Sequence, residues 1–280
     1  MKDRADFARK GIARGRSVVV LGYDKGIAFV AENHSRTLHK ISEIYDRIGF
    51  AAVGKYNEFE NLRVAGVRYA DLRGYSYDRS DVSARGLANA YAQTLGSVFT
   101  QESKPYEVEI VVAEVGLSPE ADQIYRLTYD GSVADENGFV AMGGAADSIE
   151  TSLREHWQAG MPLGDALALA VRALAQDPAG GAARELDAGE LEVAVLDRTR
   201  PRRTFRRIAG PLLEALLSET DPTRDAPTDE AHPGHRDVLT GEPHQDAAGS
   251  SPRHTSTTPQ TQRPADAATA GGVSPHPDGD

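Results

Sequence analysis

Short apolar segments separated by turns fill the first part of the chain. They lie at Ser17–Tyr23, Gly26–Asn33, His39–Ile41 and Ile48–Gly54. These segments have the length and the β-branched content of strands, and the turn Asp24–Gly26 is typical of a hairpin. We therefore expect four consecutive strands that begin with a hairpin.

Two segments with helical spacing follow the fourth expected strand. The first runs from Tyr56 to about Arg73, and the second begins after Asp81. Their apolar side chains recur every three or four residues, at Phe59, Leu62 and Tyr69 in the first and at Leu87, Tyr91, Leu95 and Phe99 in the second. This spacing predicts helices that bury one side. A shorter helix is expected within residues 1–14.

The rest of the chain repeats this order. Strands are expected at Pro105–Val115, Gln123–Tyr129, Phe139–Met142, Leu191–Asp197 and Thr204–Ile208. Helices are expected at about 145–158, at Leu163–Ala175 and at Pro211–Leu217. Strands, two helices, strands, two helices and strands suit two sheets packed face to face with a helix pair outside each. The residues alone therefore predict a layered α+β domain.

The composition changes sharply near Glu219. Residues 218–280 are rich in Pro, Thr and Asp and contain no aromatic residue. Such a segment cannot bury enough apolar surface to offset the ~1–2 kcal/mol per residue lost when a backbone is ordered. We therefore expect one folded domain over 1–217 and a disordered tail over 218–280, which either recruits a partner or serves as a solubilising appendage. His232 and His235 could ligate a metal in isolation, but the sequence offers no further ligand near them.

Charge and cysteine content exclude several classes of function. The net charge is −11, but much of it lies in the tail, so nothing indicates a nucleic-acid partner. The absence of cysteine excludes a disulfide framework and a thiol nucleophile, and it fits a reducing cytosol. No apolar stretch approaches the ~20 residues of a membrane span, and no secretory signal is visible. We expect a cytoplasmic protein with no membrane partner, no cofactor and no metal.

Seven segments spread over the chain carry a family resemblance. They are Phe7–Ala13, Phe29–Asn33, His39–Arg47, Gly54–Phe59, Tyr91–Gly96, Lys104–Glu109 and Glu192–Arg207. Together they resemble proteasome-type Ntn-hydrolase subunits, specifically the actinobacterial α subunits. The resemblance covers about residues 1–217 and implies the four-layer αββα sandwich of that family.

The resemblance also implies a function. Subunits of this type form a seven-membered ring that caps rings of catalytic β subunits and controls substrate entry. The ring docks a ring-shaped ATPase through the ATPase's C-terminal tails, for degradation of unfolded proteins tagged with the modifier Pup. Family members close the pore with an extension before the first helix, but Met1 stands where that helix is already under way. We expect that the start of the sequence is internal and that no gate residue lies in it; the alternative is an open ring.

The nucleophile that would cut a peptide bond is missing from the position where this family keeps it. An N-terminal-nucleophile protease needs a Thr, Ser or Cys whose own free α-amino group takes the side-chain proton. The resemblance puts that position on Arg16, or on Ser17 if the register moves by one. Glu32 and Lys40 stand where catalytic subunits keep their acid and lysine. We therefore expect no catalytic residue; the alternative is an active hydrolase that uses Ser17 after removal of the preceding residues.

The resemblance assigns another role to Lys40. In α subunits, the lysine at this position lines a pocket that receives the C-terminal carboxylate of an activator tail. We expect Lys40, Gly15 and Gly54 to form this tail pocket, since an ammonium suits a carboxylate and a glycine lets an incoming backbone approach closely. Otherwise Lys40 is a strand-end lysine that extends to solvent. A further alternative for the whole chain is a free-standing binding module whose tail recruits partners.

Other patterns have structural explanations. Gly143-Gly144 and Asp177 fall where catalytic subunits keep supporting serines and an aspartate, and only the aspartate is retained. Glu107 and Glu109 share a strand face, as alternating residues of a half-exposed strand routinely do. The arginines from Arg198 to Arg207 lack interleaved aromatic residues beyond Phe205, which favours contacts of a surface turn over nucleic-acid binding. His34, His39 and His156 have no metal-ligand spacing.

Overall fold

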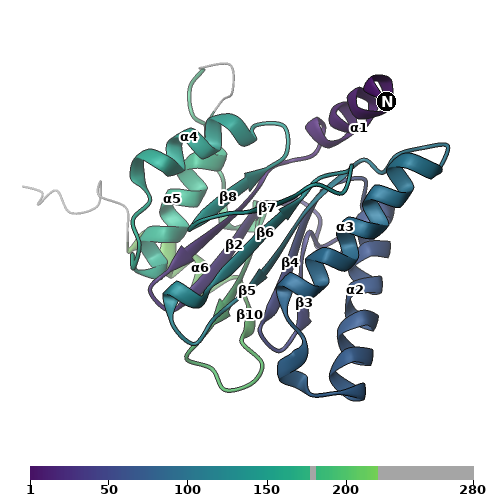
Figure 1. Cartoon of the computed structure of the whole chain (residues 1–280). Coiled ribbons are helices and arrows are strands. Elements are labelled where there is room, and N and C mark those ends of the chain that lie inside the picture. The colour runs from purple at the N-terminus through teal and green to yellow at the C-terminus, as the bar shows by residue number, and fades with distance from the viewer. Residues whose placement is uncertain (177–180, 220–280) are drawn as a thin grey trace, which may run out of the picture. The chain divides into compact units, whose positions relative to one another are not determined.

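The computed structural model of the chain describes residues 1–176 and 181–219, which belong to one compact unit (Figure 1). The helices are α1 (Lys2–Ala13), α2 (Tyr56–Ser76), α3 (Ala84–Gln101), α4 (Ala146–His156), α5 (Leu163–Ala175) and α6 (Pro211–Ser218). The strands are β1 (Val18–Tyr23), β2 (Gly26–Glu32), β3 (Ile41–Tyr45), β4 (Ile48–Gly54), β5 (Val108–Glu114), β6 (Gln123–Leu127), β7 (Val133–Asp135), β8 (Phe139–Met142), β9 (Leu191–Asp197) and β10 (Phe205–Ile208). Short 3-10 turns, η1 (Arg79–Asp81), η2 (Pro119–Ala121) and η3 (Ala188–Glu190), lie in the connections.

The strands form two antiparallel sheets of five strands each. Their orders are β10-β9-β2-β1-β8 and β3-β4-β5-β6-β7. The expected first hairpin is present, with Val18 opposite Ala31 and Tyr23 opposite Gly26. All positions of β2 are buried. A strand covered on both faces needs an uninterrupted apolar run, and the sequence shows such a run there.

Three apolar layers hold the four structural layers together. One lies between the sheets and contains Phe29, Ile41 and Met142. A second packs the outer face of the first sheet against α4 and α5, and a third packs the other sheet against α2 and α3. Figure 1 shows the helix pairs on opposite sides of the two sheets. The four-layer αββα architecture expected from the resemblance is therefore confirmed.

The third strand differs from the prediction. The expected strand began at His39, but β3 begins at Ile41 and continues to Tyr45. The backbone N–H groups of Lys40 and Ile41 donate to the carboxylate of Glu192 instead of to a neighbouring strand. A side chain from β9 therefore sets where β3 begins.

The N-terminal helix α1 buries Ala8 and Ile12 in the layer between the sheets, and Arg4 adds a polar anchor. The guanidinium of Arg4 donates hydrogen bonds to the carbonyl oxygens of Glu102 at 2.7 Å and of Val98 and Ser103 at 3.3 Å, and it lies over the ring of Phe99. Because the last carbonyls of a helix have no partner within it, a cation at the end of α3 is favourable. This contact holds α1, and with it the segment that leads into β1.

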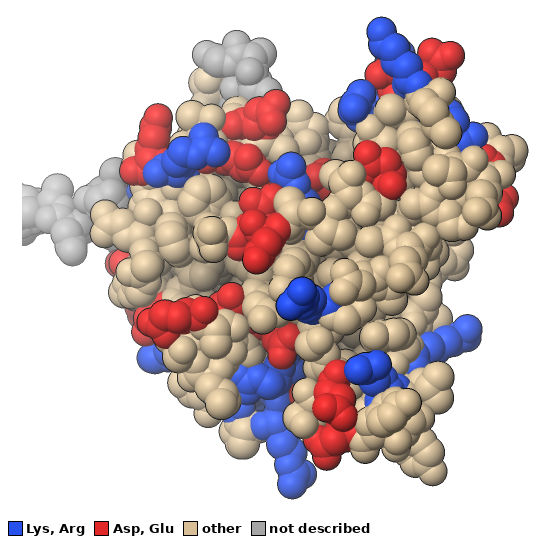
Figure 2. Space-filling view, viewed as in Figure 1, with Lys and Arg blue, Asp and Glu red and all other residues tan. Residues whose placement is uncertain are grey.

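Acidic and basic side chains are interspersed on the face of the molecule seen in Figure 2, and no broad basic area appears there. Over residues 1–176 and 181–219, no helix has both the length and the apolar character needed to cross a membrane.

Candidate functional site

Lys40 points at the segment that precedes β1. Its Nζ donates to the carbonyl oxygen of Arg16 at 2.7 Å and to that of Glu32 at 3.1 Å. An ammonium has three N–H donors, and the two carbonyls use two of them. Burial lowers the pKa of Lys40 to about 8, with a further lowering by the charge of Arg16, while Glu32 and Glu192 oppose the shift. Lys40 is therefore not the solvent-extended lysine of the alternative interpretation.

The structure brings the two predicted glycines together. A Cβ added to Gly15 would lie 3.2 Å from the nitrogen of Gly54 and 3.1 Å from the carbonyl oxygen of Ile12. Gly54 has a φ of +105°, and a Cβ there would collide with the carbonyl of Glu107. The positive φ and the close carbonyl of Glu107 both require a glycine at position 54. Lys40 is linked to this pair of glycines by its hydrogen bond to the carbonyl of Arg16, the residue after Gly15.

Ser17, the residue just before β1, is buried. Its Oγ accepts a hydrogen bond of 3.4 Å from the backbone N–H of Ala145, just before α4. A Cβ on Gly143, which has a φ of +105°, would lie 2.9 Å from the Cα of Ser17. The nitrogen of Ser17 forms a peptide bond with Arg16 in this chain. A free α-amine at Ser17, which an N-terminal nucleophile uses as its base, would require removal of residues 1–16.

The carboxylate of Glu32 is neutralised by cations. It accepts from Arg16 Nε at 3.0 Å and from Arg184 Nη2 at 3.0 Å, and it lies 3.3 Å from His34 Nε2. Burial raises the pKa of Glu32, but the hydrogen bonds from Arg184 and His34 and the charges of Arg184 and Arg16 outweigh it, so the pKa lies below its ordinary value. Glu32 is thus a fixed anion within an ion-pair cluster.

A cleft of about 430 Å³ opens beside these groups. Its lining includes Arg14, Gly15, Arg16, Ser17, Glu32 and Arg184. Of the three predicted tail-pocket residues, Gly15 lines this cleft, whereas Lys40 and Gly54 do not. These residues carry three guanidinium groups against one carboxylate, so the electrostatics favour an anionic ligand. Asp177, the aspartate singled out in the sequence, lies outside the described residues, as do His232 and His235.

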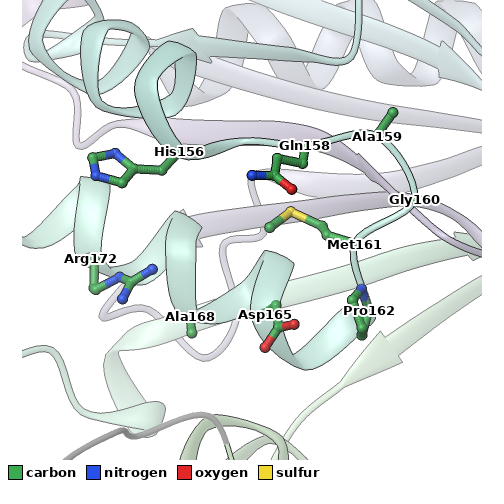
Figure 3. A pocket seen from close by; sticks show the side chains of 9 residues that line it. All are labelled: His156, Gln158, Ala159, Gly160, Met161, Pro162, Asp165, Ala168 and Arg172. Carbon is green, nitrogen blue, oxygen red and sulfur yellow. The ribbon is translucent and has the colours of Figure 1, made fainter.

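A second hollow lies elsewhere and contains none of the predicted site residues. It has a volume of about 440 Å³ and opens where α4 leads into α5, as Figure 3 shows. His156 at its rim lies 2.8 Å through Nδ1 from the carbonyl of Ser152, within its own helix. In residues 1–176 and 181–219, no group of three His, Cys, Asp or Glu side chains is arranged to hold a metal ion.

Several of the remaining charged candidates are paired within the fold. Glu107 lies just before β5, not on it, and its carboxylate is 2.8 Å from Lys104, whereas Glu109 pairs with Arg126 at 3.6 Å. The two carboxylates therefore do not act as a pair. In the arginine cluster, Arg198 pairs with Asp122, Arg203 with Glu43 and Arg207 with Glu192.

Sequence reasoning overlooked Glu192. Its carboxylate accepts hydrogen bonds from the backbone at Lys40 and Ile41 and from the side chains of Asn33 and Arg207. A signal was available, since the alternation of β9 places Glu192 on the same strand face as the buried Ala194 and Leu196. A charged residue on a buried face indicates a specific polar partner.

Known proteins match most of the chain. The description "Proteasome subunit" belongs to the family whose profile matches residues 12–196. "Proteasome subunit alpha" of Kineococcus radiotolerans is 75% identical over 224 residues, which cover 79% of this chain and 94% of that protein. Proteins of the same description from Sanguibacter keddieii and Xylanimonas cellulosilytica are 70% and 73% identical over 83% and 76% of this chain, and over 91% and 90% of their own lengths.

Proposed function

The chain belongs to the proteasome subunit family, among its α-type members, and on this premise we propose that it forms a seven-membered, non-catalytic ring that docks a ring ATPase. In this proposal the ring scaffolds catalytic β rings and controls the entry of unfolded, Pup-tagged proteins in the cytoplasm. Its tail pocket receives the C-terminal carboxylate of an ATPase tail. The observation that carries the pocket is the Lys40 ammonium at the carbonyl of Arg16, beside the paired glycines Gly15 and Gly54.

The chemistry of the site supports binding over catalysis. The side chain of Ser17 is buried. Glu32, at the place of the catalytic acid, is engaged by Arg16 and Arg184. Lys40 instead offers a partly desolvated ammonium with a donor to spare. A charge-assisted hydrogen bond to a carboxylate is strong in such a setting.

Assembly is tested by native mass spectrometry of the full chain co-expressed with the β-type subunit of its source. The proposal expects two seven-membered α rings around β rings, with Ser17 still joined to Arg16 in the α chain. A monomer would favour the binding-module alternative. A chain that newly begins at Ser17 would favour the hydrolase.

Tail binding is tested on the same assembled particle. The probe is a fluorescent peptide with the C-terminal sequence of the ring ATPase of the same organism, ending in a free carboxylate, and the same peptide ending in an amide. We expect the carboxylate form to bind and both the amide and Lys40→Ala to abolish binding. Lys25→Ala, in the exposed turn between β1 and β2, is the matched control. Equal binding by Lys40→Ala and wild type would refute the pocket.

A further inference from the structure

Glu192 is a buried carboxylate surrounded by donors from three parts of the chain. Its Oε2 accepts from the backbone N–H of Lys40 at 2.9 Å and from Asn33 Nδ2 at 2.8 Å. Its Oε1 accepts from the backbone N–H of Ile41 at 3.2 Å and from Arg207 Nη1 at 2.7 Å, and it lies 3.2 Å from His39 Nδ1. Only 8% of the side chain is exposed. A carboxylate with about four acceptor positions is saturated by these donors.

These hydrogen bonds join the two sheets where the chain crosses between them. Glu192 lies on β9 of one sheet, while Ile41 begins β3 of the other. Asn33 reinforces the crossing because its Nδ2 also donates to the carbonyl of Leu38 at 2.8 Å, and Arg207 Nη2 donates to the carbonyl of Ile41 at 2.6 Å. The connection from β2 to β3 is therefore held at its first residue, Asn33, and at its last two, His39 and Lys40.

The energetics favour an ionised and fixed Glu192. Burial raises its pKa, but hydrogen bonds from the Lys40 backbone, Arg207, Asn33 and the Ile41 backbone outweigh it and hold the pKa below its ordinary value. Without this acceptor, the buried N–H groups would be unpaired, and an unpaired buried donor is destabilising. The backbone at Lys40 would then have reason to move.

We propose that Glu192 is the positioning residue of the tail pocket: it fixes the backbone of Lys40 so that the Lys40 ammonium lies at the carbonyl of Arg16. The inference rests on the proposed function of Lys40 as the tail-binding residue. Glu192 itself makes its contacts with the backbone of Lys40, not with the ammonium, so it acts on a bound tail through Lys40. A glutamine at this position has nearly the same shape but replaces one acceptor with a donor, which would face N–H groups.

The test uses the full chain assembled with its β-type partner and two readouts. The first is the affinity for the carboxylate-ended ATPase peptide. Glu192→Gln should weaken binding by at least about tenfold, which corresponds to 1.4 kcal/mol. The control Asp122→Asn removes a different buried ion pair, with Arg198, near Tyr23 at the far end of β1 from Ser17. It should leave the affinity unchanged.

The second readout reports on Lys40 without any ligand. The particle is labelled with trace acetic anhydride over a range of pH and digested with trypsin. Acetylated Lys40 is then followed in the fragment Thr37–Arg47, since trypsin does not cleave after an acetylated lysine. The fragment contains no other lysine. In wild type, the midpoint of labelling should lie at about pH 8. Glu192→Gln should move it upward, because a displaced ammonium regains water. Loss of the Glu192 charge without displacement would move it downward.

The outcomes separate the two proposals. If wild type binds the peptide through Lys40 and Glu192→Gln binds it equally well, the positioning role is refuted and the pocket stands. If wild type does not bind the peptide, the pocket is refuted. The labelling midpoint of Lys40 then tests Glu192 separately, and a midpoint that Glu192→Gln leaves unchanged or lowers refutes the positioning role. If Glu192→Gln fails to assemble, Asn33→Ala removes one donor of the same cluster and should move the midpoint upward by a smaller amount.

Discussion

The Nζ of Lys40 donates a hydrogen bond of 2.7 Å to the carbonyl oxygen of Arg16. This contact joins the residue before β3 to the segment between α1 and β1. A carboxylate that enters the proposed pocket must share the ammonium with this carbonyl. In the proposed pocket, Lys40 would join a bound carboxylate to the segment that follows α1.

Tail binding should depend on pH through Lys40. Its pKa is lowered from 10.5 to about 8, chiefly by burial. The charged form needed for a carboxylate ligand therefore predominates below pH 8 and is lost as the pH rises through that value. We expect the peptide affinity to fall above pH 8, by up to about tenfold per pH unit.

The measurement is a series of peptide titrations between about pH 6.5 and 9.5. Lys40→Arg is the control, because a guanidinium stays charged over this range. Any remaining binding by that variant should be independent of pH. A flat wild-type profile would contradict the assignment of the ammonium as the binding group.

The two pocket glycines should respond differently to alanine. At Gly54, φ is +105° and a Cβ would meet the carbonyl of Glu107, so Gly54→Ala should cost about 2 kcal/mol and lower the Tm by roughly 4–8 °C. At Gly15 the contacts of a Cβ are tight but not severe, so Gly15→Ala should retain the fold and lose peptide binding. Gly189→Ala, where a Cβ meets nothing within 4 Å, is the control. Thermal unfolding and peptide binding together check all three variants.

Ser17→Ala should leave peptidase activity of the assembled particle unchanged. The hydroxyl accepts one long hydrogen bond from Ala145, so we expect a loss of stability of no more than about 1 kcal/mol. The activity is measured with a fluorogenic peptide on particles that contain wild-type β-type subunits. A marked fall in activity at equal assembly would support the alternative in which Ser17 is a nucleophile.

Removal of Arg4 should release α1 locally. Its guanidinium donates to three carbonyls at and just after the end of α3, where a cation is favourable. Arg4→Ala should therefore raise hydrogen exchange across residues 2–13 while the sheets stay protected. Arg9→Ala, whose side chain is 65% exposed, is the control on the same helix. Equal exchange in the two variants would argue against Arg4 as the anchor.

The stability of the domain should depend on pH through the side chain of Glu109. Burial raises the pKa of Glu109 from 4.5 to about 7, against the opposing charge of Arg126 and a hydrogen bond from the backbone of Gly143, while Glu150 and Glu136 add to the rise. The folded state thus binds the proton more tightly than the unfolded state. This contribution to stability is full below pH 4.5 and is lost as the pH rises through 7.

Glu109→Gln should remove this pH dependence. Relative to wild type, the variant should gain about 2–3 kcal/mol between pH 5 and pH 8. Thermal unfolding at several pH values measures the difference. A constant difference between the two proteins across this range would show that Glu109 does not titrate there.

The order and type of nearly all elements could be predicted from the residue pattern alone. Strands such as Phe139–Met142 and Leu191–Asp197, and the helix Leu163–Ala175, match their predicted bounds. These segments are apolar runs or strongly periodic ones, so local pattern and final packing agree. The exposed strand β7 was not predicted, because three exposed residues carry no periodic signal. The resemblance, confirmed by the family comparison, supplied the sandwich and the residues of the proposed pocket.

How those residues are held could not be predicted from the residue pattern, because it depends on contacts between distant segments. The sequence pattern placed a strand at His39–Ile41, but the carboxylate of Glu192, about 150 residues later, takes the N–H groups of Lys40 and Ile41 and delays β3. The same distance along the chain separates Glu32 from Arg184. Periodicity describes how a segment meets the core, whereas a hydrogen bond between side chain and distant backbone depends on two segments arriving at one place. Such contacts form only once the distant segments have come together in the fold.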